Sequence, residues 1–264
     1  MDALAEFKAA QRQAWAHFVP FELQTSAPAA RLVAFAGVQA GQRVLDVACG
    51  TGVVAVTAGR RGAHVTGLDL TPELLQRARE NAAVAEVQVE WHEGDVESLP
   101  FGDGVFDAVV SQFGHMFAPR PEVATREMLR VLRPGGRIAF STWPPELCVA
   151  GIFTLLGRYL PPPPPFVSPL AEWGEPTIVR GRLGAGVTDL VFDRAAMLFP
   201  TLSPAHYRRF FEVNAGPVLR LVQTLQREPA RLAAFRREFD EITARYLQDN
   251  VVRQDYLLTR ATKL

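Results

Sequence analysis

Three aspartates lie near the ends of three successive apolar segments, a pattern that predicts one shared binding site. Asp46 lies in the first segment, Asp69 ends the second, 23 positions later, and Asp95 follows the third. Because the carboxyl ends of parallel strands meet at the same edge of a sheet, the three carboxylates would face one crevice. Carboxylates attract cations and repel phosphates. The crevice therefore suits a ligand that carries positive charge and no pyrophosphate.

A glycine turn follows the first of these segments. Gly50 and Gly52 lack a Cβ, so the backbone can bend sharply and approach a ligand, and the next helix presents its free N–H groups there. Residues 50–55 also satisfy the dinucleotide fingerprint G-x-G-x-x-G/A, and a turn that only packs a helix on a strand remains an alternative. Asp46 favours a ligand with an ammonium and a sulfonium, and S-adenosylmethionine is such a ligand.

The position of Asp69 predicts a more specific contact with the same ligand. In doubly wound folds a carboxylate at the tip of the second strand accepts hydrogen bonds from two ribose hydroxyls. Each such bond contributes roughly 1.5–3 kcal/mol before competing costs, enough to decide whether an adenosyl ligand binds at micromolar or millimolar concentration. An aspartate that only begins the next turn is the alternative.

Strands alternate with helices along the first half of the chain, which predicts an α/β fold with a doubly wound, mostly parallel, Rossmann-like sheet. Further apolar segments at 187–200 and 255–262 bring the expected sheet to seven strands, with an antiparallel C-terminal strand at its edge. The remaining strands are expected near 43–47, 65–69, 87–91, 106–111 and 137–142, and the helices between them at 51–60, 71–83 and 121–133.

The flanking segments are expected to complete a single domain over residues 1–264. An amphipathic helix at 4–18 is a lid or only packs against the domain edge, and a second helix starts at Pro28. Helices that start near Ser203, Pro217 and Pro229 would lie over the strand tips. The five prolines at 161–165 form a spacer or, less simply, a docking site for a proline-binding partner. The expected parts are N-terminal helices (1–40), a cofactor-binding core (41–143), a substrate-side region (144–254) and the last strand (255–264).

Five stretches, in order and spacing, carry a resemblance to a known family. V-L-D-V-A-C-G-T-G, the acid Asp69, G-D-V-E-S-L-P-F, F-D-A-V-V-S and L-R-P-G-G-R-I closely resemble the class I S-adenosylmethionine-dependent methyltransferases, in particular the quinone-biosynthesis C-methyltransferases. The resemblance covers about residues 40–143. One departure is Ala48, where many relatives have glycine.

The resemblance implies how the cofactor is held. Ala48, Gly50 and Gly52 would border the methionine part, Asp69 would hold the ribose, and Ser111 would lie beneath the methionine moiety. Asp95 with Val96 would recognise the adenine. The predicted cofactor-binding residues are Asp46, Ala48, Gly50, Thr51, Gly52, Asp69, Leu70, Asp95, Val96 and Ser111.

Methyl transfer from a sulfonium requires no obligatory catalytic motif. The leaving group is already activated, so an in-line displacement depends mainly on positioning and on exclusion of water. His115 follows the fourth strand and is the candidate for a general base, or else it only shapes the pocket. A wall of aromatic side chains would favour a small apolar or aromatic acceptor. Its candidates are Trp15, Phe113, Phe117, Trp143, Trp173 and Phe211.

Composition narrows the other classes of function. Lysine and arginine number 28, as do aspartate and glutamate, so no net charge favours nucleic acid or an anionic membrane. Only Cys49 and Cys148 are present, which argues against a zinc site or a disulfide framework. We expect a cytoplasmic enzyme without metal or membrane anchor, whose oligomeric state the sequence does not give. A non-enzymatic cofactor-binding protein and an NAD-dependent oxidoreductase are the competing hypotheses.

Overall fold

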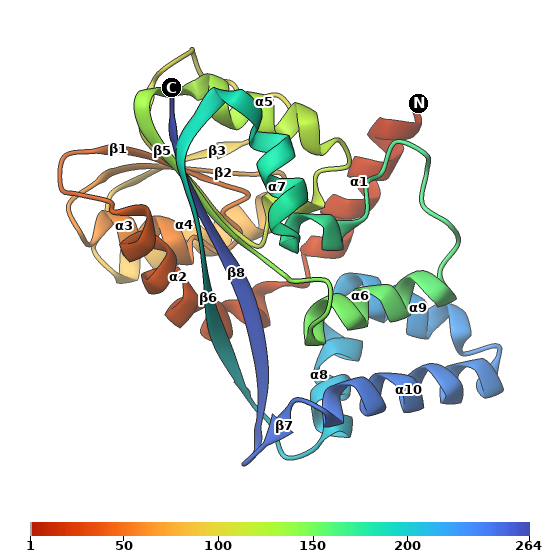
Figure 1. Ribbon diagram of the computed structural model, residues 1–264. Coiled ribbons are helices and arrows are strands. Elements are labelled where there is room, and N and C mark those ends of the chain that lie inside the picture. Colours follow the sequence, from red (N-terminus) through yellow and green to blue (C-terminus); the bar gives the residue numbers. More distant parts are fainter. Residues whose placement is uncertain (1) are drawn as a thin grey trace.

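The computed structural model describes residues 2–264, and its centre is one mixed β-sheet (Figure 1). The strand order is β3-β2-β1-β4-β5-β8-β6, and β7 pairs with β8 outside this path. The first five strands are mutually parallel, whereas β8 runs antiparallel to both β5 and β6. The strands are β1 (Arg43–Val47), β2 (His64–Asp69), β3 (Val89–Glu93), β4 (Phe106–Gln112), β5 (Leu132–Thr142), β6 (Val187–Pro200), β7 (Leu247–Gln248) and β8 (Val251–Lys263).

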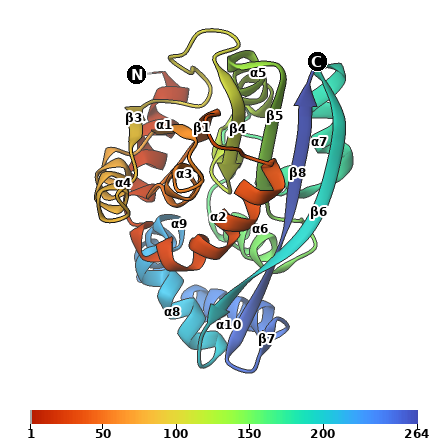
Figure 2. The same ribbon diagram turned by 90° about the vertical axis from the view of Figure 1, so that its left-hand side faces the viewer.

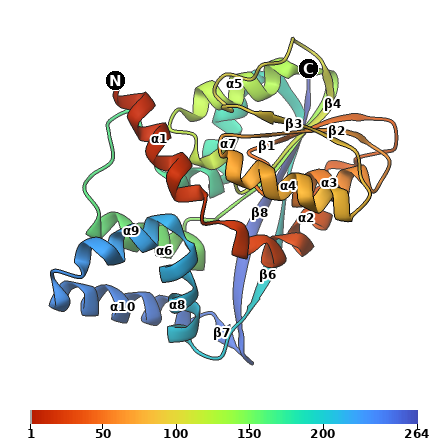
Figure 3. The ribbon, with the colours of Figure 1, turned by 180° about the vertical axis from the view of Figure 1, so that it is seen from behind.

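Helices cover both faces of the sheet, and a second group of helices stands apart from it. Helices α2, α3 and α4 lie on one face and α5 and α7 on the other, while α6, α8, α9 and α10 gather around the far ends of β6 and β8 (Figures 1 and 3). The helices are α1 (Ala3–Trp15), α2 (Glu22–Ala36), α3 (Val53–Gly59), α4 (Pro72–Val84), α5 (Pro121–Val131), α6 (Cys148–Tyr159), α7 (Pro176–Leu183), α8 (Pro204–Asn214), α9 (Gly216–Leu225) and α10 (Pro229–Ala244).

The doubly wound, mostly parallel fold is therefore confirmed, with two differences in detail at its C-terminal side. The two-residue strand β7 adds an eighth strand, and the last strand lies inside the sheet, so that β6 forms the edge (Figure 2). The burial of the two strands explains their order. Residues 256–259 of β8 are consecutively buried, as a strand with neighbours on both sides requires, whereas β6 is mostly exposed or half-buried.

Helix α2 begins six residues earlier than its sequence predicts, and Pro28 lies inside it rather than at its start. A proline there removes one backbone hydrogen bond. Burial of the apolar side of the helix offsets this loss, because Ala29, Leu32 and Val33 are fully buried against the sheet. Gly37 ends the helix in the left-handed conformation, with φ of 68°.

Two apolar cores result from this arrangement. The larger lies between the sheet and the helices on its two faces. The smaller is formed by α6, α8, α9 and α10 with Phe199 of β6 and Val252 of β8. The half-buried Phe153 on α6 packs against both.

Helix α1 and the proline segment lie over the junction of the two cores. A Cβ on Gly216, at the start of α9, would come within 2.1 Å of the carbonyl oxygen of Ala14, so glycine allows α1 and α9 to meet closely. Residues 161–165 belong to no helix or strand, as their five prolines predict. This spacer leads to Phe166, whose ring packs edge-on against Phe7 of α1 at 5.9 Å.

Candidate functional site

A deep cavity opens at the carboxyl ends of β1, β2 and β4, where the sequence predicts a crevice. Its other walls come from α1, α2, α6, the end of α8 and the start of α9. One continuous cavity therefore joins the tips of these strands to both the N-terminal helices and the helices near the C-terminus.

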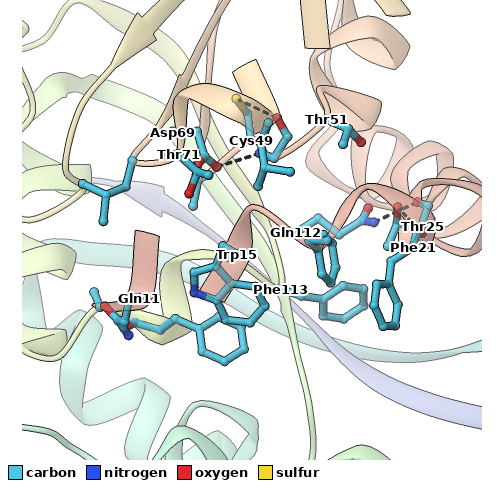
Figure 4. Close-up of a pocket in the computed structure, with 18 of the residues that line it drawn as sticks. Gln11, Trp15, Phe21, Thr25, Cys49, Thr51, Asp69, Thr71, Gln112 and Phe113 are labelled. Atoms are coloured by element: carbon cyan, nitrogen blue, oxygen red, sulfur yellow. Dashed lines mark hydrogen bonds between the residues drawn. The ribbon is translucent and has the colours of Figure 1, made fainter. Parts of the chain in front are cut away.

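The carboxylate end of the cavity is organised by Asp69, at the tip of β2. One oxygen of its carboxylate accepts the N–H of Gly50 at 2.7 Å, and the other accepts the N–H of Thr71 at 2.8 Å (Figure 4). Asp69 thereby ties the turn after β1 to the start of α4. Burial raises the pKa of this carboxyl, and the two backbone N–H groups oppose the shift.

Asp46 lies beside it on β1 and is 1% exposed. Its Oδ2 accepts the N–H of Ala55 at 3.0 Å, whereas its Oδ1 has no hydrogen-bond partner. Burial raises the pKa of Asp46 well above its ordinary value, and the charge of Asp69 adds to the shift. A ligand cation at this point would stabilise the ionised form and would satisfy the free oxygen.

The turn between β1 and α3 is shaped by residues with positive φ. Ala48, Gly50 and Gly52 have φ of 53°, 55° and 78°. Ala48 is costly in this conformation, which a glycine would adopt without strain. A Cβ at Gly50 would meet nothing within 4 Å, so the backbone is open to a ligand. Gly52 instead faces Trp91 and does not line the cavity, although the sequence assigns it to the cofactor.

At the third aspartate, the cavity is closed by α1. The ammonium nitrogen of Lys8 forms ion pairs with Asp95 Oδ2 at 2.5 Å and with Glu97 Oε2 at 2.6 Å. The Glu97 side chain is completely buried. Gln11 donates to the carbonyl of Phe117 at 2.8 Å. Lys8 and Gln11 both line the cavity, so α1 is one of its walls and not merely edge packing.

The opposite end of the cavity is aromatic, as predicted. Phe113 stacks on Trp143 with ring centres 4.0 Å apart, and Trp15 of α1 packs on Phe117 at 4.3 Å. These four side chains and Phe211 all line the cavity. Figure 4 shows Trp15 and Phe113 on one side of it and Asp69 and Thr71 on the other.

Four predicted site residues do not line the cavity: Gly52, Ser111, His115 and Trp173. His115, the candidate base, is fully buried and packs on the rings of Phe140 and Trp173, each at 4.6 Å, and neither ring nitrogen has a partner. Burial, with a smaller effect of the Arg182 charge, lowers the pKa of His115 to about 3. In this structure the ring of His115 packs in the core and does not face the cavity.

Ser111 and Trp173 are structural in the same region. Ser111 Oγ donates to the carbonyl of Val47 at 2.7 Å and accepts the N–H of His115 at 3.1 Å, which ties β4 to β1 behind the cavity. Trp173 is 1% exposed and packs against His115 and Phe140 on the far face of the sheet. Ser111 was predicted at the site from the resemblance, and Trp173 as one of the aromatic candidates for the acceptor wall.

Several cavity residues were not predicted from the sequence. Most of them lie on the N-terminal helices, on α6 and at the start of α9, which carry no motif, and three lie on β4, β6 and β8. The three- and four-residue spacing of Cys148, Ile152, Leu155 and Leu156 could have revealed α6. The missed residues include Lys8, Thr25, Gln112, Val149, Ile152, Phe153, Leu156, Met197, Pro217, Val218 and Gln254.

Two kinds of feature are absent from residues 2–264: a cluster of metal ligands and a membrane-spanning helix. No group of three or more histidine, cysteine, aspartate or glutamate side chains in this range is arranged to hold a metal ion. None of the helices in it combines the length and the hydrophobicity that a bilayer crossing needs.

The fold is Rossmann-like, and its cavity lies at the carboxyl ends of the parallel strands, with carboxylates at one end and aromatic side chains at the other. Residues 45–140 match the methyltransferase domain family. A demethylmenaquinone methyltransferase of Thermus thermophilus is 41% identical over 130 residues, which are 48% of this chain and 58% of that protein. An uncharacterized protein of Mycobacterium tuberculosis is 37% identical over 233 residues, which are 88% of this chain and 85% of that protein.

The solved structure of a putative methyltransferase from Bacillus halodurans superposes on this chain with a TM-score of 0.60. The match covers 90% of this chain and 99% of that chain, at 22% sequence identity, and it shows the fold. Together these findings show that the chain belongs to the class I S-adenosylmethionine-dependent methyltransferases and is related to the quinone-biosynthesis subgroup. S-adenosylmethionine is the cofactor of this class. The free oxygen of buried Asp46 and the open backbone at Gly50 fit its cationic methionine part.

Proposed function

We propose that this enzyme methylates a small apolar or aromatic acceptor by in-line transfer. The observation that carries the proposal is the continuity of the cavity, which joins the aspartates at the tips of β1 and β2 to the aromatic side chains around Phe113 and Phe117. A cofactor bound at the first end would present its methyl group towards a ligand at the second. Because both ends belong to one cavity, the two ligands would be held next to each other for the transfer.

In this proposal the residues around the turn after β1 hold the cofactor. Asp69 accepts hydrogen bonds from the ribose hydroxyls, and Asp46 provides the negative charge next to the methionine part. Asp95 with Val96 recognises the adenine. The other contacts are made by Ala48, Gly50, Thr51 and Leu70, all of which line the cavity.

Positioning, not proton transfer by a side chain, supplies the rate in this proposal. The cofactor supplies a methyl group on an already activated sulfonium. The titratable side chains of residues 2–264 that line the cavity are Lys8, Asp46, Cys49, Asp69 and Asp95, all at or near the cofactor end. The aromatic end offers apolar surface and amide groups, which orient the acceptor and keep water away.

We also propose that the chain works as a single methyltransferase domain. Trp15 near the N-terminus, Phe117 in the middle and Gln254 near the C-terminus line the same cavity. A fragment that lacked either end would lose part of the wall.

An acceptor screen with isotopically labelled cofactor tests the function. Wild-type protein is incubated with S-adenosylmethionine that carries a labelled methyl group and with a metabolite extract, and labelled products are sought by mass spectrometry. We expect label in an apolar or aromatic product, and none with the Asp69→Ala variant. Tight cofactor binding without labelled product across a broad panel would favour a non-enzymatic cofactor-binding protein, and micromolar binding of NAD would favour an oxidoreductase.

A further inference from the structure

Two buried polar atoms on the cavity wall have no partner in the protein. Among the side-chain atoms of residues 2–264 that are buried and unpaired, only Asp46 Oδ1 and Gln112 Oε1 belong to residues that line the cavity. A buried acceptor without a donor costs roughly 1–3 kcal/mol, and a ligand that donates to it recovers this energy. Asp46 lies at the cofactor end of the cavity. Gln112 Oε1 is therefore the unpaired atom to which the proposed cofactor contacts assign no partner.

The orientation of the Gln112 amide is set by a single hydrogen bond. Its Nε2 donates to the main-chain carbonyl of Thr25 on α2 at 2.8 Å. Only the amide nitrogen can donate to a carbonyl, so the other atom, Oε1, is the free acceptor. Figure 4 shows the Gln112 side chain beside Phe113, extended towards Thr25 and Phe21.

The neighbouring side chains leave this buried oxygen without a hydrogen-bond partner. The hydroxyl of Thr25 already donates to the carbonyls of Phe21 and Glu22, at 3.1 and 3.0 Å. Ser141 is the strand neighbour of Gln112 and also has an unpaired hydroxyl, but it does not line the cavity. Gln112 itself stands next to Phe113, whose ring stacks on Trp143 in the aromatic wall.

We propose that Gln112 determines acceptor specificity by accepting a hydrogen bond from a neutral O–H or N–H group of the acceptor. This inference rests on the proposed function and narrows its substrate class. The acceptor is a flat apolar molecule with a donor group, and not a pure hydrocarbon. Anionic groups are disfavoured at this point because an amide oxygen repels them.

Binding of a matched pair of probes tests the proposal without knowledge of the natural acceptor. Wild-type protein saturated with S-adenosylhomocysteine, the demethylated cofactor, is titrated with 2-naphthol and with 2-methoxynaphthalene by ligand-observed NMR, at a pH at which the naphthol is neutral. We expect the naphthol to bind about tenfold more tightly, since the ether lacks the donor. In the Gln112→Met variant the two affinities should become equal.

Two control variants separate this role from a general effect on the cavity. Gln11→Met makes the same substitution on the wall formed by α1, and Ser141→Ala removes the neighbouring hydroxyl, so both should keep the preference for naphthol. Calorimetric affinity for S-adenosylmethionine should change less than twofold in Gln112→Met.

Several results would overturn the inference. They are equal binding of the two probes to wild-type protein, a preference that survives in Gln112→Met, and a preference that disappears in Ser141→Ala. A large loss of cofactor affinity in Gln112→Met would assign the oxygen to the cofactor instead. These results concern binding alone, so they are distinguishable from a failure of methyl transfer, which would show as bound cofactor without labelled product.

Discussion

At the scale of single residues, Asp69 does more than face a ligand. Its two oxygens hold the N–H groups of Gly50 and Thr71, so it also fixes the turn that would carry the cofactor. A carboxylate that accepts two backbone N–H groups still has lone pairs for two ribose hydroxyls. The same side chain can therefore shape the site and bind in it.

Replacement of Asp69 should consequently be severe for cofactor binding. We expect Asp69→Ala to weaken S-adenosylmethionine binding by about 2–4 kcal/mol, or roughly 30-fold or more, because charge-assisted hydrogen bonds are lost. Isothermal titration calorimetry measures this directly. Asp103→Ala, an exposed carboxylate paired only with Arg130, is the matched control and should bind normally. Equal affinities of the two variants would contradict the ribose role.

The buried ring of His115 should make the stability of the protein depend on pH. Its pKa of about 3 in the folded protein lies below the ordinary value of 6.5, so the unfolded chain binds more protons between these pH values. Stability that depends on the neutral ring is fully present above pH 6.5 and is lost as the pH falls towards 3.

The His115→Leu variant should therefore resist mild acid better than wild type. Between pH 7 and pH 5 the histidine should cost wild-type protein about 2 kcal/mol of unfolding free energy that the variant does not lose. Urea unfolding at the two pH values measures the difference. The variant should also retain methyl transfer, and identical pH dependence of stability in both proteins would show that the ring is not buried as described.

The residue-level prediction succeeded where chemistry leaves a local signature. Asp46 lies within an apolar segment, Asp69 ends one and Asp95 follows one, and all three line the cavity. His115 was predicted to face the cavity because it follows β4 closely in sequence. Closeness in sequence does not determine the direction in which the chain turns after a strand. In the structure Ser111 Oγ accepts a hydrogen bond from the backbone N–H of His115, and the His115 ring packs away from the cavity.

At the scale of elements, α1 is the segment whose role changes most between sequence and structure. The sequence left a lid and simple edge packing open. In the structure Lys8 joins α1 to Asp95 and to the buried Glu97, at one of the predicted cofactor contacts. Arg12 makes a second pair, with Glu93, but both side chains are about half exposed, at 42% and 50%.

These two pairs should differ in how strongly they hold α1. We expect Lys8→Met to speed hydrogen exchange of the α1 amides by about tenfold or more, because α1 then loses its ion pairs with Asp95 and the buried Glu97, while Glu97 keeps its pair with Arg120. Arg12→Met should have little effect, because exposed pairs contribute roughly 0–1 kcal/mol. Mass spectrometry of the exchanged protein reports both. Equal acceleration in the two variants would mean that Lys8 does not anchor the helix.

Strands and capped helices were predictable because their signals are local. Segment 187–200 matches β6 in both bounds, and Pro204 and Pro229 start α8 and α10 as expected. Helix α6 was missed because neither a cap nor a motif marks it, and the early start of α2 was missed because Pro28 reads as a helix start. In both cases burial against distant segments, which no local pattern reports, decides the outcome.

At the scale of the whole molecule, cofactor binding should stabilise the fold. A ligand at 100 times its dissociation constant adds about 2.7 kcal/mol to the unfolding free energy, which corresponds to a rise in Tm of about 5–10 °C for a chain of this size. We expect this rise with S-adenosylmethionine and none with NAD, because the Asp46 carboxylate beside the turn after β1 repels a pyrophosphate. Thermal scans with each ligand make the comparison. A rise with NAD alone would refute the identity of the ligand.

The existence of two cores has a consequence for how such a protein can diversify. The apolar wall near the acceptor comes largely from α6 and α9, which pack on the smaller core, whereas Asp46 and Asp69 stand on the sheet of the larger one. Exchanges at wall positions such as Ile152 or Val218 can alter the shape of the chamber without touching the tips of β1 and β2. New acceptors are then accessible by single steps from an enzyme that keeps its donor throughout.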